Sequence, residues 1–259
     1  QANKNLQKQM YCEGLAYKLT PIEYGGTGGT NTEKMLALLN NDYDLVKRNG
    51  DSVKVGFDWG NMKGEGVLVD YYTMRMVQNL RLQMMKLSDQ LINENRYDDA
   101  LNVLNITFEE MPVEKEQVPA DDICYYLCAN YFEAGDTTKG MEIGHTLVSL
   151  QLDRLNFFSD LDKDKFLPYV WPELGRALFN VEMLREASLT NLDRTKMFEP
   201  NSATNNASFL AKGVLANTNY DEICLKLRNV YRNNPQKKKF FENQQKFPSY
   251  YTQLWKSGI

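Results

Sequence analysis

The sequence predicts a mainly α-helical fold of stacked helical hairpins, an α-solenoid, with a small irregular or short-strand segment at its N-terminus. From about residue 72 to residue 149, apolar side chains such as Leu87 and Leu91 recur at helical spacing. Turn residues at Asn95 and Gly135 divide this stretch into pairs of helices. A binding surface, rather than an enclosed catalytic centre, is typical of such an arrangement.

A pattern of about 34 residues begins at Arg81 and ends at Glu114, the length of one tetratricopeptide (TPR) repeat. Its apolar, small and closing positions are Leu87, Ser88, Leu91, Ala100, Leu104 and Pro112. A second unit begins at Asp121, with Gly140 in the position that Ala100 fills in the first. The two units therefore resemble TPR-like hairpins. Because such hairpins usually hold other molecules rather than catalyse reactions, we expect a binding or structural module and not an enzyme.

Composition limits the classes of partner. The chain has 259 residues, of which 42% are hydrophobic and 25% are charged, as is usual for a globular protein. A net charge of −4 gives no reason to expect nucleic acid. No apolar run approaches the ~20 residues that a membrane-spanning helix needs. The chain begins at Gln1, which suggests excision from a longer protein, so membrane contact is expected only through a region that precedes it.

Three segments are expected along the chain. Residues 1–75 form an irregular or mixed segment that packs on the repeats, 76–150 form two TPR-like hairpins, and 151–259 add helices that complete or cap the stack. Further helices are expected over residues 208–217 and 221–233 in that last segment.

Local signals give more detail in the N-terminal segment. Residues 10–22 are broken by glycine and proline, and they are expected to be extended or to form a short strand pair. Thr30 and Glu33 have the spacing of a capping box. The helix that follows is expected to include Leu45 and to stop at Gly50.

The order of several segments resembles a known family. MYCEGLAYKLTPI, NTEKML and FDWGNMKGEGVLVDYYTMRMVQNLR precede the first hairpin. This order resembles the soluble C-terminal region of an uncharacterised (DUF-type) family of bacterial multi-spanning membrane proteins, which itself resembles GT-C glycosyltransferases. The resemblance covers most of residues 8–150. It implies an accessory domain at the periplasmic face of the inner membrane, with the family's catalytic residues in the membrane portion and none in this chain.

One acidic segment has part of a calcium-binding pattern. Asp160, Asp162 and Asp164 occupy the first three ligand positions of an EF-hand loop. Lys165 and Trp171 stand where that loop needs glycine and glutamate. We therefore interpret the segment as a solvated acidic turn, and the sequence predicts no metal and no cofactor.

Other candidate chemistry is also incomplete. The glycine-rich loop over residues 25–30 lacks the lysine of a phosphate-binding loop, so a linker is expected. His145 has no nucleophile or orienting partner beside it in the sequence. Cys124 and Cys128 lie one helical turn apart on an expected buried face, a spacing that rarely gives disulfide geometry.

The TPR register also predicts a partner-binding surface, because the first helix of each repeat lines the inner groove. The surface comprises Leu82, Met85, Asp89, Tyr125 and Phe132. Solvent-facing apolar groups gathered in one place are typical of an interaction site, and Asp89 favours a basic partner. The competing interpretation is that another part of the chain fills the groove.

Two functions follow from these observations. The first is a non-catalytic scaffold of a membrane glycosyltransferase-like protein that recruits a partner protein or an acceptor polypeptide. The alternative is a glycan-binding helical-repeat protein of the cell envelope.

Overall fold

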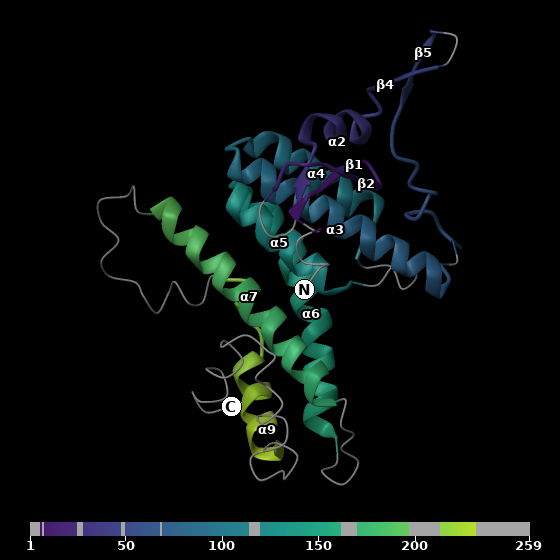
Figure 1. The fold of residues 1–259 in the computed structure, drawn as a ribbon. Helices are drawn as coiled ribbons and strands as arrows, with labels where there is room; N and C mark the ends of the chain where they lie inside the picture. Colours follow the sequence, from purple (N-terminus) through teal and green to yellow (C-terminus); the bar gives the residue numbers. More distant parts are fainter. Residues whose placement is uncertain are drawn as a thin grey trace. The chain divides into compact units, whose positions relative to one another are not determined.

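The chain folds into two compact units, residues 1–136 and residues 137–259, and each is described here by itself (Figure 1). The computed structural model describes residues 6, 8–24, 28–47, 50–67, 69–113, 120–161, 170–196 and 213–231. Helices dominate both units, and the strands that the structure describes are short and lie in the first unit. The expected mainly helical fold with short N-terminal strands is confirmed at this level.

A three-stranded sheet begins the first unit. Its strands are β1 (Met10–Glu13), β2 (Ala16–Leu19) and β3 (Gly29–Thr30), in the order β2-β1-β3. β1 pairs antiparallel with β2 and parallel with β3. Gly14 occupies the hairpin turn with φ of +78°, a backbone conformation that favours glycine. The expected strand pair in residues 10–22 is confirmed.

Helix α2 (Thr32–Leu39) follows the sheet, and its N-cap differs from the predicted one. The Asn31 side chain, not that of Thr30, accepts a hydrogen bond from the backbone N–H of Lys34 at 3.1 Å. Thr30 still belongs to β3, where its backbone N–H donates to Gln90 Oε1. Sheet pairing thus moves the start of the helix one residue along the chain from the expected capping box.

The predicted continuation of this helix through Leu45 is wrong. The helix ends at Leu39, and the chain reverses at Asn41, whose φ is +56°. Leu45 lies in β4 (Tyr43–Val46), which pairs antiparallel with β5 (Ser52–Val55). This two-stranded hairpin extends away from the helices of its unit (Figure 1).

The first predicted helical hairpin is present. Helix α3 (Tyr71–Asn93) packs against α4 (Tyr97–Glu110), and Asn95 turns the chain between them with φ of +60°. Ala100 is 0% exposed, as its small-residue position in the pattern predicts. No strand occurs in the described part of residues 80–149.

Helix α5 (Asp122–Ala134) completes the helical part of the first unit and packs on both α3 and α4. A buried ion pair ties the start of α5 to α3, because Arg81 Nη1 lies 3.2 Å from Asp121 Oδ2. Arg81 also donates to the carbonyl of Met111 at 3.3 Å. Asp121 caps α5 by accepting from the backbone N–H of Ile123 at 3.0 Å.

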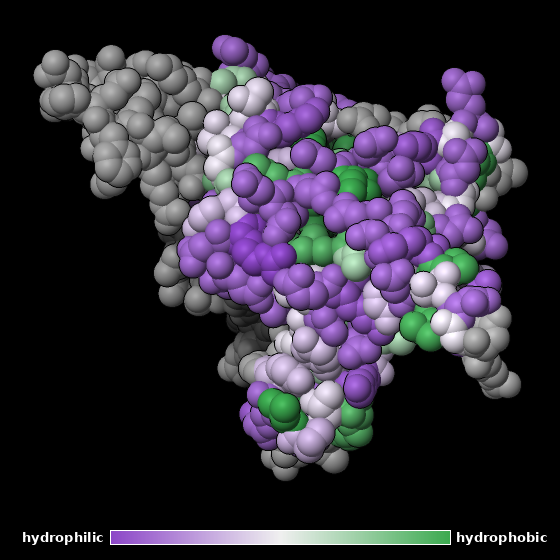
Figure 2. All heavy atoms as spheres, turned by 90° about the horizontal axis from the view of Figure 1, so that it is seen from above, coloured by the Kyte–Doolittle hydropathy of each residue, from purple (hydrophilic) through white to green (hydrophobic). Residues whose placement is uncertain are grey.

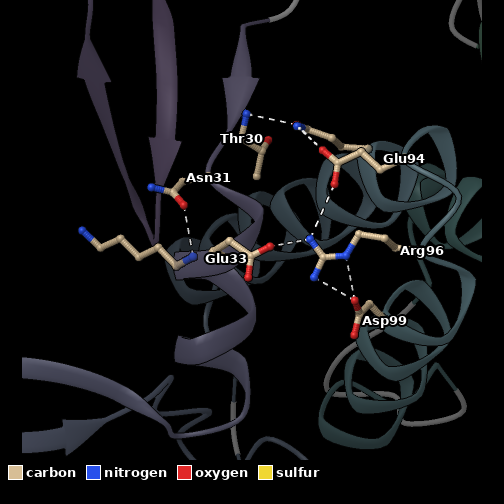
Figure 3. A network of polar contacts seen from close by, with 8 residues as sticks. Thr30, Asn31, Glu33, Glu94, Arg96 and Asp99 are labelled. Carbon is tan, nitrogen blue, oxygen red and sulfur yellow. Dashed lines mark hydrogen bonds and ion pairs between the residues drawn. The ribbon is translucent and has the colours of Figure 1, made fainter.

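A second polar network fixes α2 and the sheet on the turn between α3 and α4 (Figure 3). Arg96, in that turn, contacts Glu33 of α2 and donates from Nε to Asp99 at 2.8 Å. The backbone N–H of Thr30 donates to Gln90 of α3 at 3.2 Å. These bonds hold the N-terminal segment on the α3–α4 hairpin.

The second unit contains α6 (Thr137–Asp160), α7 (Val170–Lys196) and α9 (Tyr220–Tyr231). Helix α6 packs against both other helices. The Tyr220 hydroxyl donates to the buried Glu182 carboxylate at 2.7 Å, which joins α9 to α7.

The structure confirms some of the helices predicted for the C-terminal half and contradicts another. A helix over residues 221–233 is confirmed by α9 as far as the described residues extend. A helix over residues 208–217 is wrong in its described part, where residues 213–217 form turns. The helices of the second predicted hairpin, α5 and α6, are present but belong to different units, so their stacking as a TPR-like repeat stays a prediction.

Among the helices described, none is long and apolar enough to cross a membrane.

Candidate functional site

The five residues of the predicted partner-binding surface lie on two helices of the first unit. Leu82, Met85 and Asp89 are half-buried on α3. Tyr125 and Phe132, on α5, are each 1% exposed. The last two side chains therefore do not present an open surface, and the three on α3 are the part of the predicted surface that solvent reaches.

Asp89 is half-buried, and its carboxylate is bonded to α5 within the first unit. Its Oδ1 accepts a hydrogen bond of 2.6 Å from Asn130 Nδ2, which also donates to Ser88 Oγ at 2.8 Å. Burial raises the pKa of Asp89 above its ordinary value, although the bond from Asn130 opposes this. Asp89 thus links α3 to α5, and its charge is only partly compensated there.

A cavity of about 650 Å³ opens in the first unit and includes one predicted residue, Leu82. Ligand sites in proteins commonly have volumes of about 300–1,000 Å³ and mostly apolar walls. The β1–β2 hairpin, the turns that precede α3, and α3 itself supply the walls. The lining residues are Leu15 and Tyr17, then Asp58, Trp59, Gly60, Met62, Val67 and Val69, and on α3 Thr73, Met76, Val77, Asn79, Leu80, Leu82 and Gln83.

The wall between β5 and α3 is a series of turns. Asp58 Oδ1 accepts from the backbone N–H of Gly60 at 3.0 Å, and Gly60 and Asn61 have positive φ values of +59° and +53°. Trp59 and Met62 pack against a buried cluster of Val77, on α3, and Met111, which anchors this wall. The segment then ends at Asp70, which caps α3.

The opposite wall is fixed to α3 by a chain of polar contacts. The thiol of Cys12 donates to Gln83 Oε1 at 3.0 Å, and Gln83 Nε2 donates to the Tyr17 hydroxyl oxygen at 2.7 Å. Lys86 Nζ donates to the same oxygen at 3.3 Å. Tyr17 therefore accepts from two groups that can only donate, and its hydroxyl can still act as a donor.

Apolar side chains also reach solvent at the cavity rim. Leu15 is 66% exposed and Met76 is 63% exposed, and both line the cavity. Figure 2 shows that most of the face it views is hydrophilic, with hydrophobic groups at separate places. An exposed apolar rim around an apolar cavity is typical of an interaction site.

Burial raises the pKa of all four thiols, Cys12 included, so none has the lowered pKa of an activated nucleophile. Burial raises the pKa of Cys124 to about 12, that of Cys224 to about 11, and that of Cys128 as well. A reactive cysteine instead has a lowered pKa and is partly exposed. His145 is exposed on α6.

The expected calcium-like turn lies mostly outside the described residues. Asp160 ends α6, whereas Asp162 and Asp164 are not among the residues that the structure describes. Within the described ranges, no three His, Cys, Asp or Glu side chains come together as a metal site would require.

Sequence reasoning found Leu82 but missed the rest of the cavity. One signal in the sequence could have indicated the wall before α3: a cluster of glycines surrounds Trp59 and Met62 there. Glycine-rich turns beside aromatic residues can present a wall for a ligand, but only the fold brings β2 to face them. No protein-family model, curated protein or solved structure matches the chain.

Proposed function

We propose that this chain is a non-catalytic interaction module whose first unit captures a partner polypeptide through the cavity beside α3. One observation carries the proposal: the cavity has mostly apolar walls and an exposed apolar rim at Leu15 and Met76. Exposed apolar groups of this kind lose contact with water when a partner covers them, which favours association.

The cavity is large enough to hold more than one side chain of a polypeptide. Its walls combine thioether, aliphatic and aromatic groups from Met62, Met76 and Trp59. Methionine side chains adapt to differently shaped partners. The resemblance stated above supports a setting at the periplasmic face of the inner membrane, where the partner would be a protein or an acceptor polypeptide of a glycosyltransferase-like membrane protein.

A second candidate function is glycan binding, and one observation favours it. The ring of Trp59 shares the cavity with the polar groups of Asp58 and Asn79. An aromatic ring beside a carboxylate and an amide can stack on a sugar ring and bind its hydroxyl groups. The cavity is nevertheless lined mostly by aliphatic groups, which cannot satisfy the hydroxyls of a sugar. For this reason we propose polypeptide binding as the leading function and glycan binding as the second candidate.

Peptide and glycan arrays probed with the same purified protein distinguish the two functions. The test variant is Met76→Asp, which places a charge at the cavity rim on an exposed side chain and should leave stability nearly unchanged. Leu225→Asp on α9, where Leu225 is 55% exposed, is the matched control.

Peptides that bind the wild type and Leu225→Asp but not Met76→Asp would support the proposal. If glycans bind the wild type and Leu225→Asp but not Met76→Asp, and no peptide does so, the result would favour glycan binding instead. If no ligand on the arrays depends on Met76, both functions are wrong.

A further inference from the structure

Strand β2 is an edge strand with open backbone groups. In the sheet order β2-β1-β3, only one side of β2 is paired. The backbone N–H of Thr20 donates to the carbonyl of Gln9, so residues 9 and 20 form a hydrogen-bonded pair. Such pairs alternate along an antiparallel ladder. Tyr17 and Leu19 therefore turn their N–H and C=O groups away from β1.

The hydrogen bonds between β1 and β3 agree with the outward orientation of the Tyr17 and Leu19 backbone groups. Cys12 lies opposite Tyr17, and its carbonyl accepts from Asn31 N–H at 2.9 Å, on the β3 side. Among the described residues, no other strand pairs with the outer side of β2. Edge strands with unpaired N–H and C=O groups are templates for an additional strand.

The cavity lies along this same open edge. Leu15 and Tyr17 line it, whereas none of its described lining residues belongs to β1 or β3. All four residues of β2 are exposed. The open backbone groups of β2 and the apolar cavity thus form one continuous surface of the first unit.

The charge of the cavity indicates what kind of side chain accompanies the apolar one. Asp58 is the one charged residue among the described lining residues. Its Oδ1 is engaged by Gly60 N–H, which leaves Oδ2 for a ligand. Residues two apart in a strand lie on the same face, about 7 Å apart. A lysine or arginine two residues from the buried apolar side chain would therefore reach the same cavity.

We propose that β2 takes an extended segment of a partner polypeptide as an additional strand, with an apolar side chain in the cavity and a lysine or arginine two residues away beside Asp58. The inference rests on the proposed function and specifies how the partner binds. Main-chain bonds to Tyr17 and Leu19 provide affinity, and the cavity provides specificity, as in other cases of strand addition.

The probe is the terminally blocked heptapeptide Thr-Lys-Thr-Leu-Thr-Lys-Thr, which places lysine on both sides of leucine on one face and so does not depend on strand direction. Binding is measured by calorimetry on the full chain. Methylating backbone nitrogens one at a time should lower affinity about fivefold or more at every second residue and little at the residues between. Replacing both lysines with glutamate should also weaken binding.

Two substitutions at one position test the protein side of the pairing. Leu19→Pro removes the N–H that faces the partner but no bond to β1, so we expect affinity to fall about fivefold or more. Leu19→Ala keeps that N–H and should bind nearly as the wild type does. Thermal unfolding of both variants checks that the β1–β2 hairpin persists.

Three results would overturn the inference. The first is a heptapeptide that does not bind. The second is binding that Met76→Asp abolishes but that neither backbone methylation nor Leu19→Pro changes; this would leave the proposed function standing and remove only strand addition. The third is a dimer, seen by sedimentation, that Leu19→Pro dissociates, because a second copy would then occupy the edge.

Discussion

The hydroxyl oxygen of Tyr17 on β2 lies 2.7 Å from Nε2 of Gln83 on α3, and this bond joins two walls of the cavity. Residues that are 66 positions apart in the chain thereby fix the distance between the sheet edge and the helix. Since Gln83 is buried and also accepts from Cys12, its amide is oriented from both ends. A cavity held in this way is already formed when a partner arrives.

This bond can be measured by a double-mutant cycle. Tyr17→Phe removes the hydroxyl, and Gln83→Leu removes the amide with little change of shape. Each variant should lose about 1 kcal/mol of unfolding free energy, and the coupling between them should be about 0.5–1.5 kcal/mol. Urea unfolding gives these values, and additive effects would show that the two side chains do not interact in solution.

Arg81 and Asp121 should be the most sensitive polar pair of the first unit. Arg81 is 1% exposed, so its loss or that of its partner leaves a buried group without its counter-charge. We expect Arg81→Met to lower the unfolding free energy by about 3 kcal/mol.

Asp121→Ser, which keeps an N-cap residue for α5, should cost a similar amount because it removes the carboxylate that faces the buried guanidinium. Combining the two changes should restore much of the loss. If Arg81→Met costs no more than an exposed substitution, the ion pair does not stabilise the fold.

Asp89 should give a pH-dependent effect of defined sign. Its pKa is raised in the folded state, so its ionised form costs stability at neutral pH. Asp89→Asn keeps an acceptor for Asn130 and removes the charge, so it should raise the melting temperature at pH 7.

The gain should shrink as the pH falls through the raised pKa of Asp89, and it should vanish below the ordinary value of an aspartate, about 3.9. Melting temperatures of both proteins between pH 3 and pH 7 test this. A loss of stability in Asp89→Asn at pH 7 would mean that the carboxylate is stabilised by a cation in the fold.

The helices were predictable because their signals are local. Asn95 and Gly135 mark the ends of α3 and α5, and both adopt positive φ where the chain turns. Apolar spacing placed Ala100 in the core, where the structure has it. Residues near one another in sequence determine each of these features, so one sequence suffices to find them.

The β4–β5 hairpin, the cavity and the burial of the predicted surface were not predicted from the sequence. β4 and β5 are short, and the helical apolar spacing that ended at Leu45 outweighed their weak strand signal. Tyr125 and Phe132 have the spacing of groove residues, but tertiary packing buries them. The cavity needs Leu15, Trp59 and Met76 to converge, which no local pattern encodes.

Methionine methyl resonances test the central claim, that a polypeptide binds in the cavity, most directly. Met62 and Met76 line the cavity, whereas Met141 on α6 and Met183 on α7 lie in the other unit and serve as internal references. The protein is labelled at its methionine methyl groups and titrated with the peptide that binds most strongly on the array. We predict that the signals of Met62 and Met76 shift in a saturable way while those of Met141 and Met183 remain in place. Unchanged Met62 and Met76 signals at saturating peptide would contradict it.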